Sequence, residues 1–157
     1  MTSWTRAVEA AHVATLTALV GVVVVEPFAG HRRADDWTAW LTGQQRVDRV
    51  MAQVGPILFL STAAAATGAA LVAAAQHRRS VTAGRATAAV CTAAAIGVTL
   101  RVNAPANVRI RAWQPAGRPP LDWRVVRARW ERAHRVRKVL VTVGAVGSLW
   151  GELRARL

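Results

Sequence analysis

The sequence is poor in the residues that build covalent and zinc-dependent frameworks. It has one cysteine, Cys91, no tyrosine, and four histidines that lie far apart. A single cysteine excludes a disulfide scaffold, and the histidines do not have zinc-finger spacing. Acidic residues are also scarce, at 8 against 21 lysines and arginines, so the net charge is +13. The fold is therefore expected to form without disulfides or zinc fingers, in a strongly basic chain.

Apolar residues, in contrast, are plentiful and gathered into four runs. A hydrophobic content of 53% in 157 residues excludes disorder and fits one domain. We predict four membrane-spanning helices, at residues 10–28, 50–75, 86–102 and 136–151. The second run carries no charge and is long enough for a hydrocarbon core of about 30 Å. The abundance of alanine favours helices over a β-barrel.

The predicted fold is an all-α, integral membrane four-helix bundle that forms a single domain over residues 1–157. Polar loops are expected at 29–49 and 103–122. The first is a loop or a short interfacial helix, with Trp37 and Trp40 at the depth of the lipid headgroups. The first run resembles a secretion signal, but it ends in Glu-Pro-Phe rather than in a small-residue cleavage site, so we interpret it as a retained span. The alternative is a soluble helical bundle, which would have to bury the uncharged second run.

Basic residues in short loops indicate which side of the membrane a loop lies on. The segment 101–138 holds 11 of the basic residues and only two acidic ones. We therefore expect 29–49 and 101–138, and with them the site, on the cytoplasmic side of a bacterial cell membrane. The expected partners are the lipid bilayer and a hydrophobic small molecule; nucleic acid is not expected, because the basic segment has no nucleic-acid motif. The oligomeric state stays open.

The first candidate site lies in the string Asn103-Ala-Pro-Ala-Asn107, where the third run ends. Pro105 lacks an amide hydrogen and disfavours a helical Ala104, so we expect the helix to stop or unwind here. Asn103 and Asn107 would then cap the broken helix or bind a polar ligand. Unwound backbone at membrane depth is tolerated only beside protein or a wet cavity, which indicates a site nearby.

A second pattern follows Asp122, which we expect to cap a helix beginning at Trp123. On a helix with 100° per residue, six side chains fall within about 40° of one line along the helix: Trp123, Arg127, Trp130, His134, Arg137 and Val141. The small residues Gly144 and Ser148 continue this line. This pattern predicts a basic amphipathic helix that leads into the fourth span and lines a polar pocket. The alternative is a basic interfacial helix that lies on anionic lipid.

These residues carry a family resemblance. The string Arg101 to Ile110, then Trp123, then Arg-Trp-Glu-Arg-Ala-His-Arg-Val-Arg at 129–137 resembles the anthrone oxygenase-like family of small four-helix integral membrane proteins. The family pattern has Asn-x-Pro-x-Asn, a later Trp, and an Arg-Trp followed by Asn or His and then Arg. The matching positions are Asn103, Pro105, Asn107, Trp123, Arg129, Trp130, His134 and Arg137.

The resemblance implies a membrane-bound oxygenase that turns an anthrone into an anthraquinone in aromatic polyketide biosynthesis, with dioxygen as co-substrate and no cofactor. It implies that His134 removes a proton, as the side chain whose unperturbed pKa lies nearest neutrality. Stabilisation of the enolate would fall to Arg137, Arg129, Asn103 and Asn107. Substrate contacts would come from Trp113, Trp123, Trp130 and Glu26. Many members carry Asn at the position of His134, so a purely positioning role for it stays open.

A metal site is a weaker alternative. Glu26 is a carboxylate at the end of the first span, which marks it as a functional candidate. A metal site with His134 and His31 has no support from spacing, and His12 lies about 21 Å from Glu26 along the helix. An ion pair of Glu26 with Arg137 is the structural alternative, and we expect no metal. The alternative function is a non-catalytic membrane protein that binds anionic lipid or assists a biosynthetic partner.

Overall fold

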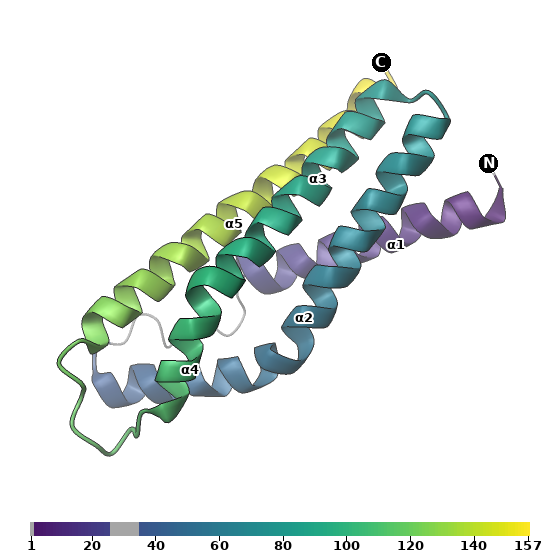
Figure 1. The fold of residues 1–157 in the computed structure, drawn as a ribbon. Coiled ribbons are helices and arrows are strands. Elements are labelled where there is room, and N and C mark those ends of the chain that lie inside the picture. The colour runs from purple at the N-terminus through teal and green to yellow at the C-terminus, as the bar shows by residue number, and fades with distance from the viewer. Residues whose placement is uncertain (1, 26–34) are drawn as a thin grey trace.

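The computed structural model describes residues 2–25 and 35–157, and these are helices joined by short connections (Figure 1). Helix α1 spans Ser3–Val20 and is continued by the π-helix η1, Gly21–Val25. Helix α2 spans Trp37–Ala75, and α5 spans Trp123–Arg154. Between them α3, η3 and α4, at Arg79–Val98, Thr99–Asn103 and Ala104–Ala112, follow one another without a break. The predicted all-α bundle is confirmed.

Three of these helical stretches are long and apolar enough to cross a membrane: Ser3–Val24, Trp37–Ala75 and Arg79–Ala112. Helix α5 is not among them, so the predicted fourth span at 136–151 stays a prediction. Its outward side chains there are nevertheless apolar, since Val139, Val143 and Val146 are exposed. A face of this kind is suited to contact with lipid tails.

Helix α2 begins well before the predicted second span. The expected loop 29–49 becomes helical at Trp37, because the carboxylate of Asp36 accepts a hydrogen bond of 2.8 Å from the amide of Ala39 and caps the helix. The helix then bends part-way along its length (Figure 1). Pro56 lies inside it and removes the hydrogen bond to the carbonyl of Ala52, which accounts for the bend.

The expectation that the third helix stops at Asn103–Asn107 is wrong. The backbone widens into the π-helical turn η3 and then continues as α4 to Ala112. Ala104 keeps helical angles, φ −64° and ψ −48°. Pro105 falls in the first turn of α4, where a missing amide hydrogen costs little. The predicted loop 103–122 therefore shrinks to the residues after α4.

Helices α3 and α5 approach most closely through glycines. A Cβ added at Gly84 would lie 2.4 Å from the carbonyl oxygen of Gly147, and one at Gly151 would lie 2.6 Å from that of Ser80. Side chains are excluded at both positions, so the two backbones are in direct contact. The small residues expected to continue the α5 stripe, Gly144 and Ser148, are buried as predicted.

A tryptophan-rich layer closes one end of the bundle. The start of α2, α4 and the start of α5 lie together there, opposite the two chain ends (Figure 1). Its buried core consists of Trp37, Trp40, Leu41, Ala106, Ile110, Val126 and Trp130, with Trp113 and Trp123 packed against it. Trp37 and Trp40 are only 7% and 1% exposed, so their rings pack inside the bundle, and their depth in the membrane stays a prediction. Gln45 closes the layer by donating to the carbonyls of Ile110 and Trp113, each at 2.9 Å.

Candidate active site

The stripe predicted along α5 faces the interior. Trp130 and His134 are buried, at 5% and 7% exposure, and Arg137 is half-buried. The arginines on the opposite face of α5, at 124, 132 and 135, are exposed. The helical periodicity of the sequence therefore predicts which side of α5 is buried.

His134 and Arg137 are in direct contact. A guanidinium nitrogen of Arg137 lies 2.6 Å from Nδ1 of His134. A guanidinium only donates, so Nδ1 must present its lone pair and the hydrogen of the neutral ring must sit on Nε2. The geometry therefore fixes the tautomer of His134, and Nδ1, the atom a base would use, is covered by Arg137.

The ring of His134 is also held from its face. The indole of Trp130 stacks on it with ring centroids 5.2 Å apart and an interplanar angle of 6°. The indole in turn donates from Nε1 to Oδ1 of Asn107 at 2.7 Å. Asn107 thus orients Trp130, and Trp130 orients His134, so three of the predicted site residues form one chain of contacts between α4 and α5.

Arg137 has a further anchor in the π-helical turn. Its guanidinium donates to the hydroxyl oxygen of Thr99 at 3.2 Å, and that hydroxyl donates to the carbonyl of Ala95 at 2.9 Å. The other π-helical segment, η1, also contacts α5, and Val23 in η1 shares a buried cluster with Val141. Segments of π-helix are frequent at functional sites, and here η3 anchors Arg137 while η1 packs on α5 at Val141, one turn further along.

Asn103 is 1% exposed, and its Nδ2 donates to the carbonyl of Trp130 at 3.2 Å. Its Oδ1 receives no hydrogen bond from any residue that the structure describes. The family resemblance implies that Asn103 and Asn107 donate to an oxyanion. Asn103 donates one N–H to the helix and presents a buried acceptor, and Asn107 accepts from Trp130 through Oδ1. Donation by the remaining N–H groups of the two amides stays a prediction.

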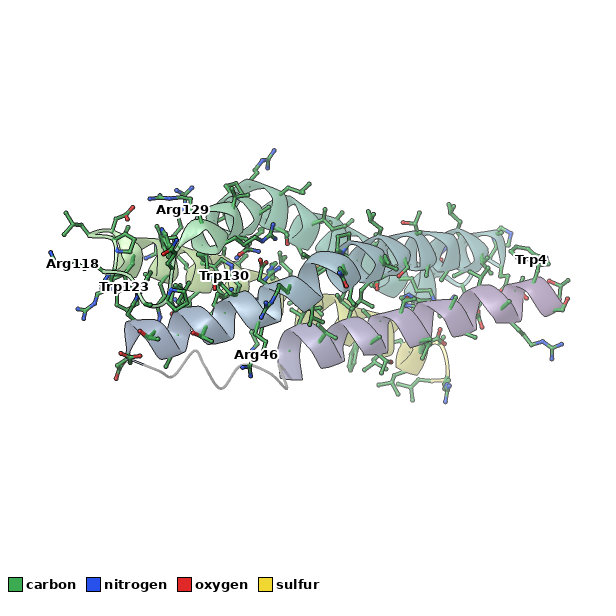
Figure 2. All side chains as sticks on the ribbon, turned by 90° about the horizontal axis from the view of Figure 1, so that it is seen from below. Trp4, Arg46, Arg118, Trp123, Arg129 and Trp130 are labelled. Atoms are coloured by element: carbon green, nitrogen blue, oxygen red, sulfur yellow. The ribbon has the colours of Figure 1, made fainter. Side chains whose placement is uncertain are left out.

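The remaining predicted residues do not join this group. Figure 2 shows Arg129 projecting from the outer side of the bundle, and it is exposed. Trp113 and Trp123 belong to the tryptophan layer, where their rings lie 5.4 and 5.3 Å from that of Trp37. Glu26 and His31 lie outside the described residues. The structure thus brings together Asn103, Asn107, Trp130, His134 and Arg137.

Two further features bear on ligand binding. A shallow hollow of about 360 Å³ lies beside the tryptophan layer and is lined by Asp35, Trp123, Arg124, Arg127, Ala128 and Glu131. Among the residues described, no three histidine, cysteine or acidic side chains gather closely enough to hold a metal ion. The group formed by Asn103, Asn107, Trp130, His134 and Arg137 offers amide, indole, imidazole and guanidinium groups.

A charged cluster at the other end of the bundle is absent from the sequence-based interpretation. Arg85 is 4% exposed and donates to Glu9 of α1, to Glu152 of α5 and to the carbonyl of Ala69. Arg78 also pairs with both carboxylates. One turn further inward, Nε2 of His12 lies 2.9 Å from the hydroxyl of Ser148. The sequence could have predicted this cluster, because Glu9 and Glu152 are two of the few acidic residues and lie at the ends of apolar helices.

Comparison with known proteins adds the family. Residues 48–147 match the model of a family described as anthrone oxygenase, which is more than half of the chain. The match includes Asn103, Asn107, Trp130, His134 and Arg137. No curated protein and no solved structure matches the chain.

Proposed function

The chain belongs to the anthrone oxygenase family, and from this premise we propose that it is a membrane-bound oxygenase of hydrophobic aromatic ketones of the anthrone type. The substrate's methylene group becomes a second ketone. One atom of dioxygen enters the new carbonyl and the other leaves as water, so that R₂CH₂ and O₂ give R₂C=O and H₂O. The proposed reaction needs no cofactor, because the substrate's own carbanion reduces dioxygen.

The contact between Arg137 and His134 is the observation that carries this proposal. Removal of a methylene proton places negative charge on the ketone oxygen of the substrate. A guanidinium is protonated at all relevant pH values and stabilises such an oxyanion through charge-assisted hydrogen bonds. Arg137 provides this group beside a neutral imidazole, inside the helical bundle.

Proton removal follows from the same contact. In the free protein a nitrogen of Arg137 covers Nδ1 of His134. When the guanidinium turns to the ketone oxygen, the Nδ1 lone pair is released and accepts the methylene proton. The base becomes active only when the substrate's oxygen is bound, which limits proton loss to molecules that Arg137 has recognised.

The oxygen steps then balance without further reactants. The enolate gives one electron to dioxygen, and the resulting radical and superoxide combine at the former methylene carbon to form a peroxide anion. The imidazolium of His134 returns its proton to the peroxide. Loss of water breaks the O–O bond, removes the remaining hydrogen of that carbon as a proton, and forms the C=O bond. Trp130, which stacks on His134, offers an apolar surface for a flat substrate.

Oxygen uptake by the purified protein in nanodiscs tests this function, with an anthrone as substrate. We expect consumption of one O₂ per quinone formed and ¹⁸O from ¹⁸O₂ in the new carbonyl. Because anthrones oxidise spontaneously, the rate is compared with empty nanodiscs and with heat-denatured protein. A rate equal to these controls contradicts the proposal, as does stoichiometric release of hydrogen peroxide.

We place the proposed site on the cytoplasmic side of a bacterial membrane. The residues on the outer face of α5 indicate how deep in the bilayer it lies. Exposed arginines at 129, 132 and 135 give way to exposed valines at 136, 139 and 143. Such a change is expected at the boundary between headgroups and acyl tails. Arg118→Cys, made in a Cys91→Ser background, introduces a single cysteine. In oriented vesicles it should react with an impermeant thiol reagent only from the cytoplasmic side.

The same arginines favour a second candidate function, binding of anionic lipid without catalysis. It predicts cosedimentation with vesicles of phosphatidylglycerol that is lost when Arg129, Arg132 and Arg135 are replaced by glutamine. If oxygen uptake is absent while this binding is present, the lipid function replaces the oxygenase.

A further inference from the structure

Among the residues that the structure describes, Oδ1 of Asn103 is a buried acceptor beside the proposed site that the mechanism above leaves unused. The carbonyl of Trp130 determines the orientation of the Asn103 carboxamide. The carbonyl of Trp130 can only accept a hydrogen bond, so the atom 3.2 Å from it must be Nδ2, and Oδ1 points the other way. The side chain is 1% exposed, and no described residue donates to Oδ1.

An acceptor left without a donor in an apolar interior destabilises a fold, and buried polar groups in native proteins are mostly paired. An apolar residue of the same size, such as leucine, would fill the same space without leaving an acceptor unpaired. Asn103 also lies in the π-helical turn that holds Thr99, the anchor of Arg137, so its acceptor belongs to the same site. An unpaired acceptor in such a place indicates a donor on the bound molecule.

We propose that Oδ1 of Asn103 accepts a hydrogen bond from a hydroxyl group of the substrate, which makes Asn103 a specificity-determining residue. Arg137 binds the ketone oxygen, and Asn103 reads the hydroxyl. This inference rests on the proposed function for its substrate, and on the geometry of Asn103 for its selectivity.

A site that pairs a buried acceptor with a substrate hydroxyl discriminates against analogues that lack the donor. The test uses two unreactive quinones, 2-hydroxyanthraquinone and its methyl ether, which keeps the oxygen but cannot donate. Binding is measured by quenching of tryptophan fluorescence in nanodiscs. We expect the hydroxyl compound to bind about tenfold more tightly to the wild type, and about equally with its ether to Asn103→Leu.

Asn103→Leu keeps the branching and number of side-chain heavy atoms while removing the acceptor. Its melting temperature should equal or exceed that of the wild type, because no buried polar atom is left unpaired. If this variant fails to fold, Asn103→Ala is used in its place. Thr92→Val is the matched control, since Thr92 is buried in α3 but its hydroxyl is paired with the carbonyl of Ala88. It should keep the tenfold preference.

The outcomes separate this inference from the proposed function. Anthrone turnover with equal binding of the two quinones overturns the role of Asn103 and leaves the oxygenase in place. If the wild type prefers the hydroxyl compound over its ether but does not turn over an anthrone, the oxygenase proposal is overturned and the role of Asn103 is supported. A drop in melting temperature of Asn103→Leu with an unchanged preference shows that Asn103 is a structural residue, and also overturns the inference.

Discussion

Nδ1 of His134 accepts a hydrogen bond of 2.6 Å from Arg137, three residues further along the same helix. The contact couples a neutral imidazole to a permanent cation. Whether the Nδ1 lone pair can accept a proton therefore depends on the position of the guanidinium. Side chains three residues apart on a helix are neighbours, so the pair needs no other element to form. It is, however, oriented by Trp130 from α5 and by Thr99 from η3.

Replacement of Arg137 by glutamine should lower kcat/KM for an anthrone about 10²- to 10³-fold, since the charged donors to the enolate oxygen are lost. Oxygen uptake measures the effect. Arg129→Gln is the matched control, because it removes an exposed arginine from the same helix, and its activity should stay within about threefold of wild type. Equal losses in both variants would mean that overall charge, rather than the position of Arg137, supports activity.

His134→Asn separates the two roles of the imidazole. The carboxamide oxygen of asparagine can accept from Arg137 as Nδ1 does, so the fold and the guanidinium orientation should be kept. An amide is no base, and kcat should fall about 10²-fold or more, the usual contribution of a general base. A substrate deuterated at the methylene carbon should then show a larger primary isotope effect.

Near-normal turnover in His134→Asn would assign His134 to positioning alone. It would also move the proton acceptor to another group, with Glu26 the next candidate. The melting temperature of the variant shows whether a loss of rate reflects chemistry or unfolding.

The sequence was sufficient to predict the all-α fold and the buried face of α5, for a physical reason. Helical periodicity places Trp130, His134 and Arg137 on one side, and the burial of that side follows from its continuation into small and apolar residues. The hydrogen bonds between helices were not predictable, because the donor of Asn103 meets the backbone of Trp130, 27 residues away in the chain. Only the packed structure shows that its acceptor is left over.

The failed expectation at Pro105 has a local cause. A rule for proline predicted the end of a helix, but the π-helical turn before Pro105 begins a new first turn in which proline fits. Headgroup depth stays a prediction for Trp37 and Trp40. The packing of their rings with those of Trp113 and Trp123 was not predictable, because these residues come from distant segments.

The contact of α3 with α5 predicts a sharp difference between two glycines of one helix. Gly84→Ala should destabilise the protein by about 1–3 kcal/mol, because the new Cβ would clash with the backbone of Gly147. Gly97→Ala, where a Cβ meets nothing within 4 Å, should be neutral or slightly stabilising, as alanine is the better helix former. Thermal unfolding in detergent gives both values. Similar melting temperatures would show that the two helices lie further apart.

Arg85 ties α1, α2, α3 and α5 together at the end away from the tryptophan layer. Arg85→Gln leaves Glu9 and Glu152 paired with Arg78 alone, so stability should fall by about 1–3 kcal/mol, less than the cost of a fully broken buried pair. Arg79→Gln, an exposed neighbour, should change stability by less than about 0.5 kcal/mol. A triple variant with Arg85→Met, Glu9→Gln and Glu152→Gln should regain at least half of the loss, because no uncompensated charge stays buried. A triple variant as unstable as Arg85→Gln would instead assign the loss to packing of the arginine stem.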